Sequence, residues 1–356
     1  MKVHAIVLSL LCSGLLLAQD TIKIGVILPL SGNNSKIGES IVKAVNIFNK
    51  ECEKGHYRHK YMVIVEDDQL AGRLTAEAVM KLIDIDHVDG LASFGSSAAN
   101  VIAPRAKSAG IPHLAIATDT RVADDKFNFI HWVSPQRQAA AALDIAEKMG
   151  CKKVAMLTVR QQGYLADMEA AKLEIEKRGL ILVSNEIFNP GERDFRTQLT
   201  RIRETHPEVL IPTGYSPEIE IILRQCKQLD FRPRITSMQS FDWMLNAEDA
   251  EGLYYATASM GSAEFEAHCV KLTGASGISY GVANMYDMLN MLRSSYESMD
   301  KPDHAAAAKW LANVKDFPSA MGINIDMGAD GRTDPPAGYF KIVHGKPTPV
   351  SLDEVR

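Results

Sequence analysis

The sequence predicts an α/β protein built from two similar lobes, each a parallel β-sheet covered by helices. Short apolar runs of strand type alternate with amphipathic stretches at helical spacing over the first third of the chain, and the alternation then starts again. Such alternation is typical of a parallel sheet with helices on its faces. A length of 356 residues also exceeds what one hydrophobic core comfortably holds and suits two domains.

The first series of elements begins directly after an apolar N-terminal segment. Its strand-type runs are residues 22–28, 61–65, 88–94 and 114–117. Its helical stretches are residues 41–48, 76–83 and 98–109. Pro29 and the turn residues that follow it end the first strand, since proline cannot donate to a strand ladder.

The second series repeats this order and ends in a helical tail with strands. Its strand-type runs are residues 154–159, 180–187, 209–212, 234–237 and 253–257, with 321–325 and 338–343 in the tail. Its helical stretches are residues 139–149, 165–178, 195–204, 219–229, 281–297 and 305–314. Because no low-complexity linker separates the series, we expect several strands to cross between the lobes. The expected lobes are 21–135 with 260–334, and 136–259 with 335–356.

Composition and charge limit the classes of function. Hydrophobic residues make up 46% and charged residues 23%, which is usual for a globular protein and argues against disorder or a coiled coil. Lysine and arginine number 39 against 44 acidic residues, a net charge of −5 spread along the chain. Without a basic face to neutralise phosphates, nucleic acid is not an expected partner.

Residues 1–18 are predicted to be a signal peptide that is cleaved after Ala18. One lysine precedes an apolar run over 5–18, about 14 residues, which is too short to span a bilayer. The alternative is a lipoprotein signal lipidated at Cys12, which Leu11 disfavours because a small residue usually stands at that position. No later segment is long and apolar enough for a membrane helix, so an exported, soluble protein is expected.

Four cysteines follow the predicted cleavage site: Cys52, Cys151, Cys226 and Cys269. They form no C-x-x-C pair and are spread over more than 200 residues, which makes a metal site improbable. Buried free thiols are the favoured interpretation, and one disulfide in an oxidising compartment stays open as the alternative.

Sequence patterns of common catalytic sites are missing. The chain has no G-x-x-x-x-G-K-[ST] phosphate loop, no G-x-G-x-x-G, no H-E-x-x-H and no G-x-S-x-G. The ten histidines are scattered and are interpreted as surface or hydrogen-bonded side chains. The acidic run at 66–68 is interpreted as a solvated strand end rather than a metal site. The sequence therefore predicts no enzyme, no metal and no cofactor.

Seven stretches, in order and in register, resemble the branched-chain amino-acid-binding family of periplasmic binding proteins, type I folds that serve ABC importers. They are Ile24-Gly-Val-Ile-Leu-Pro-Leu-Ser-Gly32 with Gly38, Val65-Glu-Asp-Asp-Gln69, Phe94-Gly-Ser-Ser-Ala98, Ala109-Gly-Ile-Pro112, Asp194-Phe-Arg-Thr-Gln-Leu199, Gly214-Tyr215 with Leu223-Arg-Gln-Cys226, and Ala250-Glu-Gly252. The resemblance covers residues 21–349 and implies two Rossmann-like lobes joined by a multi-strand hinge, with a ligand cleft between them.

The resemblance implies a carboxylate site in the first lobe. Ser96 and Ser97 stand between a strand and a helix, where hydroxyl and backbone N–H groups face an anion. The family uses the equivalent of Ser97, together with Thr118 in the next strand-end loop, to hold an α-carboxylate, and we include Ala117 from that loop. Simple N-capping of the helix by Ser96 or Ser97 is the alternative, and both can hold at once.

The second lobe is expected to supply tyrosines and an acid. Tyr215 matches a family position at the end of a strand, and Tyr164 resembles another, in a loop that is shorter here. Asp242 falls where the family places the partner of the ligand's α-ammonium, which needs a counter-charge when buried. The alternatives are loop tyrosines that pack on their neighbours and an exposed loop aspartate beside Trp243.

The chain also departs from the family. Branched-chain-specific members carry tryptophan just before the first-loop glycine, where this chain has Ile37, and the common disulfide near the third strand has no cysteines here. The grip on an amino-acid backbone is thus expected to be kept, while the side-chain pocket, with Ile37 in it, is altered.

The function expected from the sequence is that of a monomeric, exported binding protein of the periplasm. It would close on a small amino-acid-like ligand and deliver it to the membrane permease subunits of an ABC importer. The alternative is a ligand-sensing protein for an amide, urea or aromatic acid that signals through a membrane or regulatory partner. An enzyme of unknown type is the third and weakest hypothesis.

Overall fold

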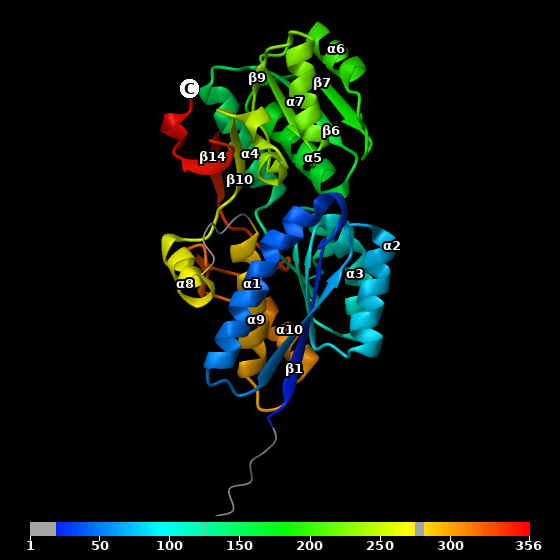
Figure 1. The fold of residues 1–356 in the computed structure, drawn as a ribbon, viewed down its shortest axis with the longest axis vertical. Coiled ribbons are helices and arrows are strands. Elements are labelled where there is room, and N and C mark those ends of the chain that lie inside the picture. The colour runs from blue at the N-terminus through cyan, green and yellow to red at the C-terminus, as the bar shows by residue number, and fades with distance from the viewer. Residues whose placement is uncertain (1–18, 125, 275–280) are drawn as a thin grey trace, which may run out of the picture.

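The computed structural model describes residues 19–124, 126–274 and 281–356, and the predicted signal peptide lies outside this part of the chain. Two α/β lobes lie one above the other, and several segments of chain pass between them (Figure 1). The predicted fold class is therefore confirmed. None of the helices in the described ranges is long and apolar enough to cross a bilayer.

Lobe 1, the lower lobe in Figure 1, is built on a six-stranded parallel sheet. Its strands, in spatial order, are β13 (Arg332–Thr333), β5 (Asn128–His131), β4 (His113–Ile116), β3 (Gly90–Phe94), β1 (Thr21–Leu28) and β2 (Lys60–Asp67). Strand β1, next to the edge strand β2, is apolar throughout its second half, as expected for a strand buried on both faces.

Helices cover both faces of this sheet. They are α1 (Ser35–Lys54), α2 (Gly72–Met80) with a π-helical turn (Lys81–Ile85), α3 (Ser96–Ala109), α8 (Ala263–Thr273), α9 (Val282–Glu297) and α10 (His304–Ala312). Side chains of α1, α9 and α10 form one large core with the sheet, and those of α2 and α3 form a smaller core on the other face. Residues from both halves of the sequence thus make up lobe 1.

Lobe 2 contains a parallel and an antiparallel sheet. The parallel sheet has the order β7 (Ile181–Phe188), β6 (Lys153–Val159), β8 (Val209–Thr213) and β9 (Arg234–Ile235). The antiparallel sheet has the order β10 (Tyr254–Ala258), β14 (Ala337–Val343) and β15 (Lys346–Val350). The helices of lobe 2 are α4 (Pro135–Lys148), α5 (Gln162–Lys177), α6 (Arg196–Glu204) and α7 (Glu218–Gln228). Lobe 1 also contains a small antiparallel ribbon, in which β11 (Phe317–Pro318) pairs with β12 (Asn324–Ile325).

Three segments cross between the lobes, leading into α4, out of β10 and into β14. Asp334 joins two of them, because its Oδ1 accepts from the Ser134 amide at 3.0 Å and its Oδ2 from Arg137 Nε at 2.6 Å. The Ser259 amide donates to the Pro336 carbonyl oxygen at 3.3 Å. This bond joins the segment that leaves β10 to the segment that enters β14. The crossing segments therefore bend together.

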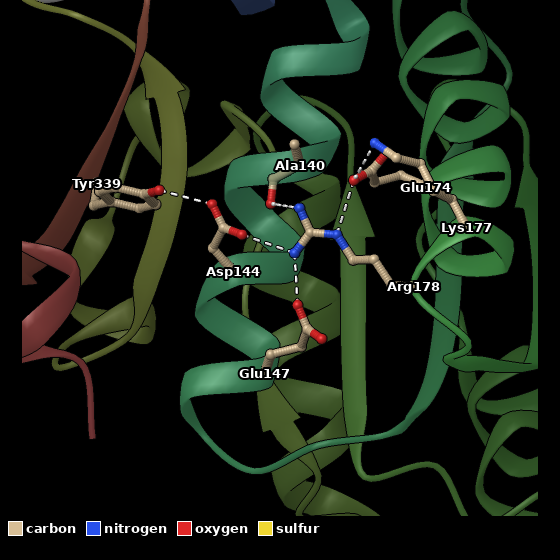
Figure 2. A network of polar contacts seen from close by, with 7 residues as sticks. All are labelled: Ala140, Asp144, Glu147, Glu174, Lys177, Arg178 and Tyr339. Carbon is tan, nitrogen blue, oxygen red and sulfur yellow. Dashed lines mark hydrogen bonds and ion pairs between the residues drawn. The ribbon is translucent and has the colours of Figure 1, made fainter.

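On the lobe-2 side, the partly buried Arg178 joins the elements that receive these segments (Figure 2). Arg178 contacts Asp144 at 2.7 Å and Glu147 at 2.6 Å on α4, and Glu174 at 2.9 Å on α5. The Tyr339 hydroxyl of β14 donates to the second oxygen of Asp144 at 2.8 Å. Since α4 and β14 both begin at the hinge, this network ties together two of the elements that the crossing segments enter.

The structure corrects two expectations about polar residues. The strand β5 was not predicted because it contains a histidine, His131. This side chain is fully buried, and its two ring nitrogens are hydrogen-bonded to Thr333 Oγ1 (2.7 Å) and Asp287 Oδ2 (3.1 Å). The acidic run at 66–68 is not a solvated strand end, because Asp68 is fully buried and accepts from Thr75 Oγ1 at 2.9 Å. The four described cysteines are free, as favoured, although one of them is only half-buried.

Candidate functional site

A small cavity of about 30 Å³ lies between the lobes. It is reached by the carboxyl ends of β3 and β4 in lobe 1 and by the segments that follow β6, β8 and β9 in lobe 2, the usual place for a ligand in α/β folds. Its lining residues are Phe94, Gly95, Ser96, Ser97, Ile116, Ala117, Thr118, Trp132, Gln161, Gly163, Tyr164, Tyr215 and Gln239.

The lobe-1 face of the cavity depends on the sharp turn between β3 and α3. Gly95 has φ +95°, a backbone conformation that residues other than glycine rarely adopt, and a Cβ there would lie 2.8 Å from the Leu70 side chain. Gly95 also provides the N-cap position of α3, which has no side-chain cap. The alternative interpretation, in which Ser96 or Ser97 caps the helix, is therefore wrong.

Ser96 holds the two strand-end loops of lobe 1 together. Its Oγ accepts from the amides of Thr118 and Asp119, both at 3.0 Å, and the side chain is buried. The hydroxyl group is thus committed to the protein's own backbone. Its contribution to a ligand site is to position α3 against the loop that follows β4.

Ser97 and the first turn of α3 provide unpaired donors. In the described part of the chain, the amides of Ser96 and Ser97 have no acceptor, and the Ser97 hydroxyl has no hydrogen-bond partner. Unpaired N–H groups at the start of a 14-residue helix carry partial positive charge and attract an anion. Together with Thr118, they form a site suited to a carboxylate.

The lobe-2 face presents two tyrosines. The rings of Tyr164 and Tyr215 pack edge to face with centroids 5.1 Å apart, and the Tyr164 hydroxyl donates to the Gly214 carbonyl oxygen at 2.9 Å. Burial raises the pKa of both phenols above the ordinary value, so both stay neutral. The tyrosines therefore form an uncharged aromatic wall.

Gln239, which sequence reasoning missed, forms the polar part of this face. It is buried in a left-handed conformation (φ +54°), and its amide donates to the Ala256 carbonyl oxygen at 2.7 Å. Its side-chain Nε2 donates to Asp167 Oδ2 at 2.9 Å, so the fully buried Asp167 lies behind it. The position of Gln239, shortly after the end of β9, could have indicated its role, since strand ends line such clefts.

Two of the eight predicted residues lie elsewhere. Asp242, in a short 3-10 helix (Ser240–Trp243), is not part of the cavity lining, and its Oδ1 accepts from the Tyr255 hydroxyl at 2.6 Å. Burial raises the pKa of Asp242 to about 7, and the hydroxyl groups of Tyr255 and Thr257 partly oppose this increase. Ile37 belongs to the core of lobe 1, because its position on α1 faces the sheet, and it is 2% exposed.

The structure brings the other six predicted residues together: Ser96, Ser97, Ala117, Thr118, Tyr164 and Tyr215. Besides Gln239, the residues that were not predicted include Phe94 and Trp132, which add aromatic surface, and Gln161 and Gly163 at the start of α5. Trp132 directly follows β5, so missing that strand meant missing its strand-end residue.

Direct contacts close the lobes over the cavity. A Cβ at Gly163 would lie 2.8 Å from Ser96 Oγ and 3.5 Å from Thr118 Cβ, so only glycine allows this approach. Asn100 Nδ2 donates to Gln162 Oε1 across the cleft at 2.8 Å. Tyr215 packs against the cores of both lobes.

A larger cavity of about 380 Å³ adjoins the first one beside the hinge. Ala117, Thr118 and Trp132 line both cavities. The second is also lined by Asp330, Arg332 and Asp334, with Arg332 paired to Asp330 at 2.5 Å and Asp334 to Arg137 at 2.6 Å. Among the described residues, no cluster of three potential metal ligands occurs here or elsewhere.

Two Rossmann-like lobes, a multi-strand hinge and an interlobe cavity with unpaired helix amides define the class of type I periplasmic binding proteins. The sequence model described as "Periplasmic binding protein" matches residues 21–346. The chain belongs to this family. Its members are binding proteins rather than enzymes.

Named relatives agree with this assignment. The Leu/Ile/Val-binding protein BraC3 of Rhizobium johnstonii is 24% identical over 327 residues, 86% of this chain and 87% of that protein. The leucine-binding protein LivK of Thermotoga maritima has a TM-score of 0.83 at 23% identity, covering 93% of this chain and 98% of that one. A solute-binding protein of an ABC transporter from Rhodopseudomonas palustris, in complex with 3,4-dihydroxybenzoic acid, has a TM-score of 0.79 at 20% identity, covering 93% and 96%.

Proposed function

We propose that this protein is the solute-binding component of an ABC importer, which captures a small organic carboxylate by closure of its lobes. The observation that carries the proposal is the set of unpaired donors of Ser96 and Ser97 in a cavity that both lobes enclose. Relatives of this fold are named for leucine binding or contain 3,4-dihydroxybenzoic acid, and these ligands share a carboxylate. Ser97 and Thr118 hold this group, and Tyr164 and Tyr215 cover it from lobe 2.

Closure moves the two lobes as units about the hinge. The moving bodies are residues 21–135 with 260–334, and 136–259 with 335–356, and the three joined crossing segments form the hinge between them. Closure brings Gly163 against Ser96 and creates a continuous surface across both lobes that a membrane permease recognises. The protein acts as a monomer in the periplasm after removal of residues 1–18.

The test combines scattering and transport. The purified protein, refolded from denaturant to remove bound ligand, is titrated with small carboxylates while small-angle X-ray scattering follows its radius of gyration. A stabilising carboxylate should reduce the radius, and the loaded protein should stimulate ATP hydrolysis by its permease complex in proteoliposomes. Ligand-induced closure without any effect on a permease would instead support a sensing role.

A further inference from the structure

We infer that the ligand is an aromatic carboxylate without an α-ammonium group. This inference rests on the proposed function and concerns the chemical class of ligand in the same cavity. In an α-amino acid the ammonium is one carbon away from the carboxylate, so both groups would share the small cavity at α3. A buried ammonium needs a carboxylate partner there, because an unpaired buried charge is very costly.

No such partner reaches the cavity. Among the described residues its lining contains no aspartate, glutamate, lysine, arginine or histidine. The undescribed segment 275–280 carries no charged side chain in the sequence. The polar surface of the cavity therefore consists of hydroxyl, amide and backbone groups, which are neutral.

Carboxyl groups near the cavity are occupied by the protein itself. Asp167 lies behind Gln239 and accepts from Gln239 Nε2 at 2.9 Å and from Gln138 Nε2 at 3.4 Å. Asp68 accepts from the Leu70 amide at 3.0 Å and from a threonine hydroxyl. Both carboxyl groups are fully buried, and burial raises the pKa of each.

Asp119 and Asp242 are also outside the cavity lining. Asp119 pairs with Arg121 at 2.8 Å and accepts from Asn100 at 2.9 Å. Asp242 does not line the cavity; its Oδ1 accepts from Tyr255, and its Oδ2 is buried in the protein without a hydrogen-bond partner among the described residues. The acids of the adjoining larger cavity, Asp330 and Asp334, are ion-paired with arginines and do not line the cavity at Ser97.

Apolar and aromatic surface replaces the missing charge. Phe94, Trp132, Tyr164 and Tyr215 line the cavity, and aromatic rings favour offset or edge-to-face packing with another ring. The cavity of about 30 Å³ has room for little more than a carboxylate, whereas an apolar cavity of about 150 Å³ accommodates benzene. A ring attached to that carboxylate would therefore extend along Trp132 toward the cavity of about 380 Å³.

The decisive experiment compares matched pairs of acids on the unmodified protein. Isothermal titration calorimetry of refolded, ligand-free protein would measure 3-phenylpropanoate against L-phenylalanine and 4-methylpentanoate against L-leucine, with benzoate, 4-hydroxybenzoate and neutral benzamide as further probes. We expect an aromatic acid to bind at least tenfold more tightly than any amino acid, and benzamide not to bind. Tighter binding of an amino acid would overturn the inference and leave the proposed function intact. Failure of every carboxylate to bind would overturn both.

A charge-introducing variant gives a second, independent measurement. Gln239→Glu places a carboxylate on the cavity wall and should weaken aromatic-acid binding at least tenfold by like-charge repulsion. Gln228→Glu, on the exposed surface of α7, makes the same change in charge away from the cavity and should alter affinity less than twofold. Equal affinities of the two variants for the aromatic acid would contradict the inference, and the matched pairs decide the matter if Gln239→Glu does not fold.

Discussion

The two faces of the cleft present different chemical groups to a ligand. On the lobe-1 face, the polar groups are mainly backbone amides and small hydroxyl groups, and a helix and two loops joined by Ser96 Oγ fix their positions. On the lobe-2 face, the surface consists of long side chains, Tyr164, Tyr215 and Gln239, that three separate segments present. A backbone site can keep its geometry while the facing side chains change, so one half of the cleft can conserve anion binding while the other changes the ligand.

Gly163→Val would break the contact between the two faces and should have the largest effect. Its side chain would overlap Ser96 Oγ, which lies 2.8 Å from the position of a Cβ, and would hold the lobes apart. We expect ligand affinity to fall at least a hundredfold, about 2.7 kcal/mol, with a larger radius of gyration in the presence of ligand. Gly72→Ala is the control, because a Cβ there meets only Val101 at 3.9 Å. Unchanged affinity of Gly163→Val would show that the closed contact is not part of binding.

Asp242→Asn tests the protonation state of the carboxyl group that accepts from the Tyr255 hydroxyl in lobe 2. The folded state raises the pKa of Asp242 from 3.8 to about 7, so the folded protein holds this proton more tightly than the unfolded chain does. As a result, the free energy of unfolding falls as pH rises from about 4 to about 7, by up to about 1.4 kcal/mol per pH unit. Asparagine does not titrate, so the variant should lose this decline and gain stability at pH 8.

Urea denaturation of the wild type and Asp242→Asn at pH 4, 5.5, 7 and 8 would measure this difference. Other buried acids, such as Asp167, contribute a decline of the same sign in both proteins, so only the difference between the curves is informative. Parallel curves would mean that Asp242 is ionised in the folded protein across this range.

Ser96→Ala and Ser97→Ala separate the framework of the lobe-1 face from its ligand contacts. Loss of Ser96 Oγ leaves two buried amides without an acceptor and should lower the free energy of unfolding by about 2 kcal/mol. Loss of the unpaired Ser97 hydroxyl should leave stability unchanged and weaken carboxylate binding about tenfold or more. Thermal unfolding and calorimetry on both variants would check this, and equal stability losses would contradict the distinction.

Tyr339→Phe should have the smallest effect and tests the rigidity of lobe 2 at the hinge. The variant removes one hydrogen bond to Asp144 and keeps the ring, so we expect a loss of about 1 kcal/mol in stability and nearly normal affinity. Denaturant unfolding would measure the stability, and a large loss of affinity would show that this network controls closure directly.

Sequence reasoning found the lobe-1 face because a strand, glycine, two serines and a helix start are contiguous. The fold class followed in the same way from the alternation of strands and helices. The lobe-2 face was harder, because its residues stand in irregular loops where a shift of three positions separates Gln239 from Asp242. Trp132 was missed because its strand owes its burial to His131 and a partner 202 residues away, which no local pattern reveals.

The last strand of lobe 1 has a consequence for how the protein is made. The pairing of β5 with β13 and the packing of α9 on α1 each join residues about 200 or more positions apart, whereas the parallel sheet of lobe 2 is complete by residue 235. Contacts between distant residues form slowly, since a long loop must close first. The parallel sheet that begins first along the chain is therefore completed last, and the parallel sheet of lobe 2 can form while the sheet of lobe 1 still lacks its final strand.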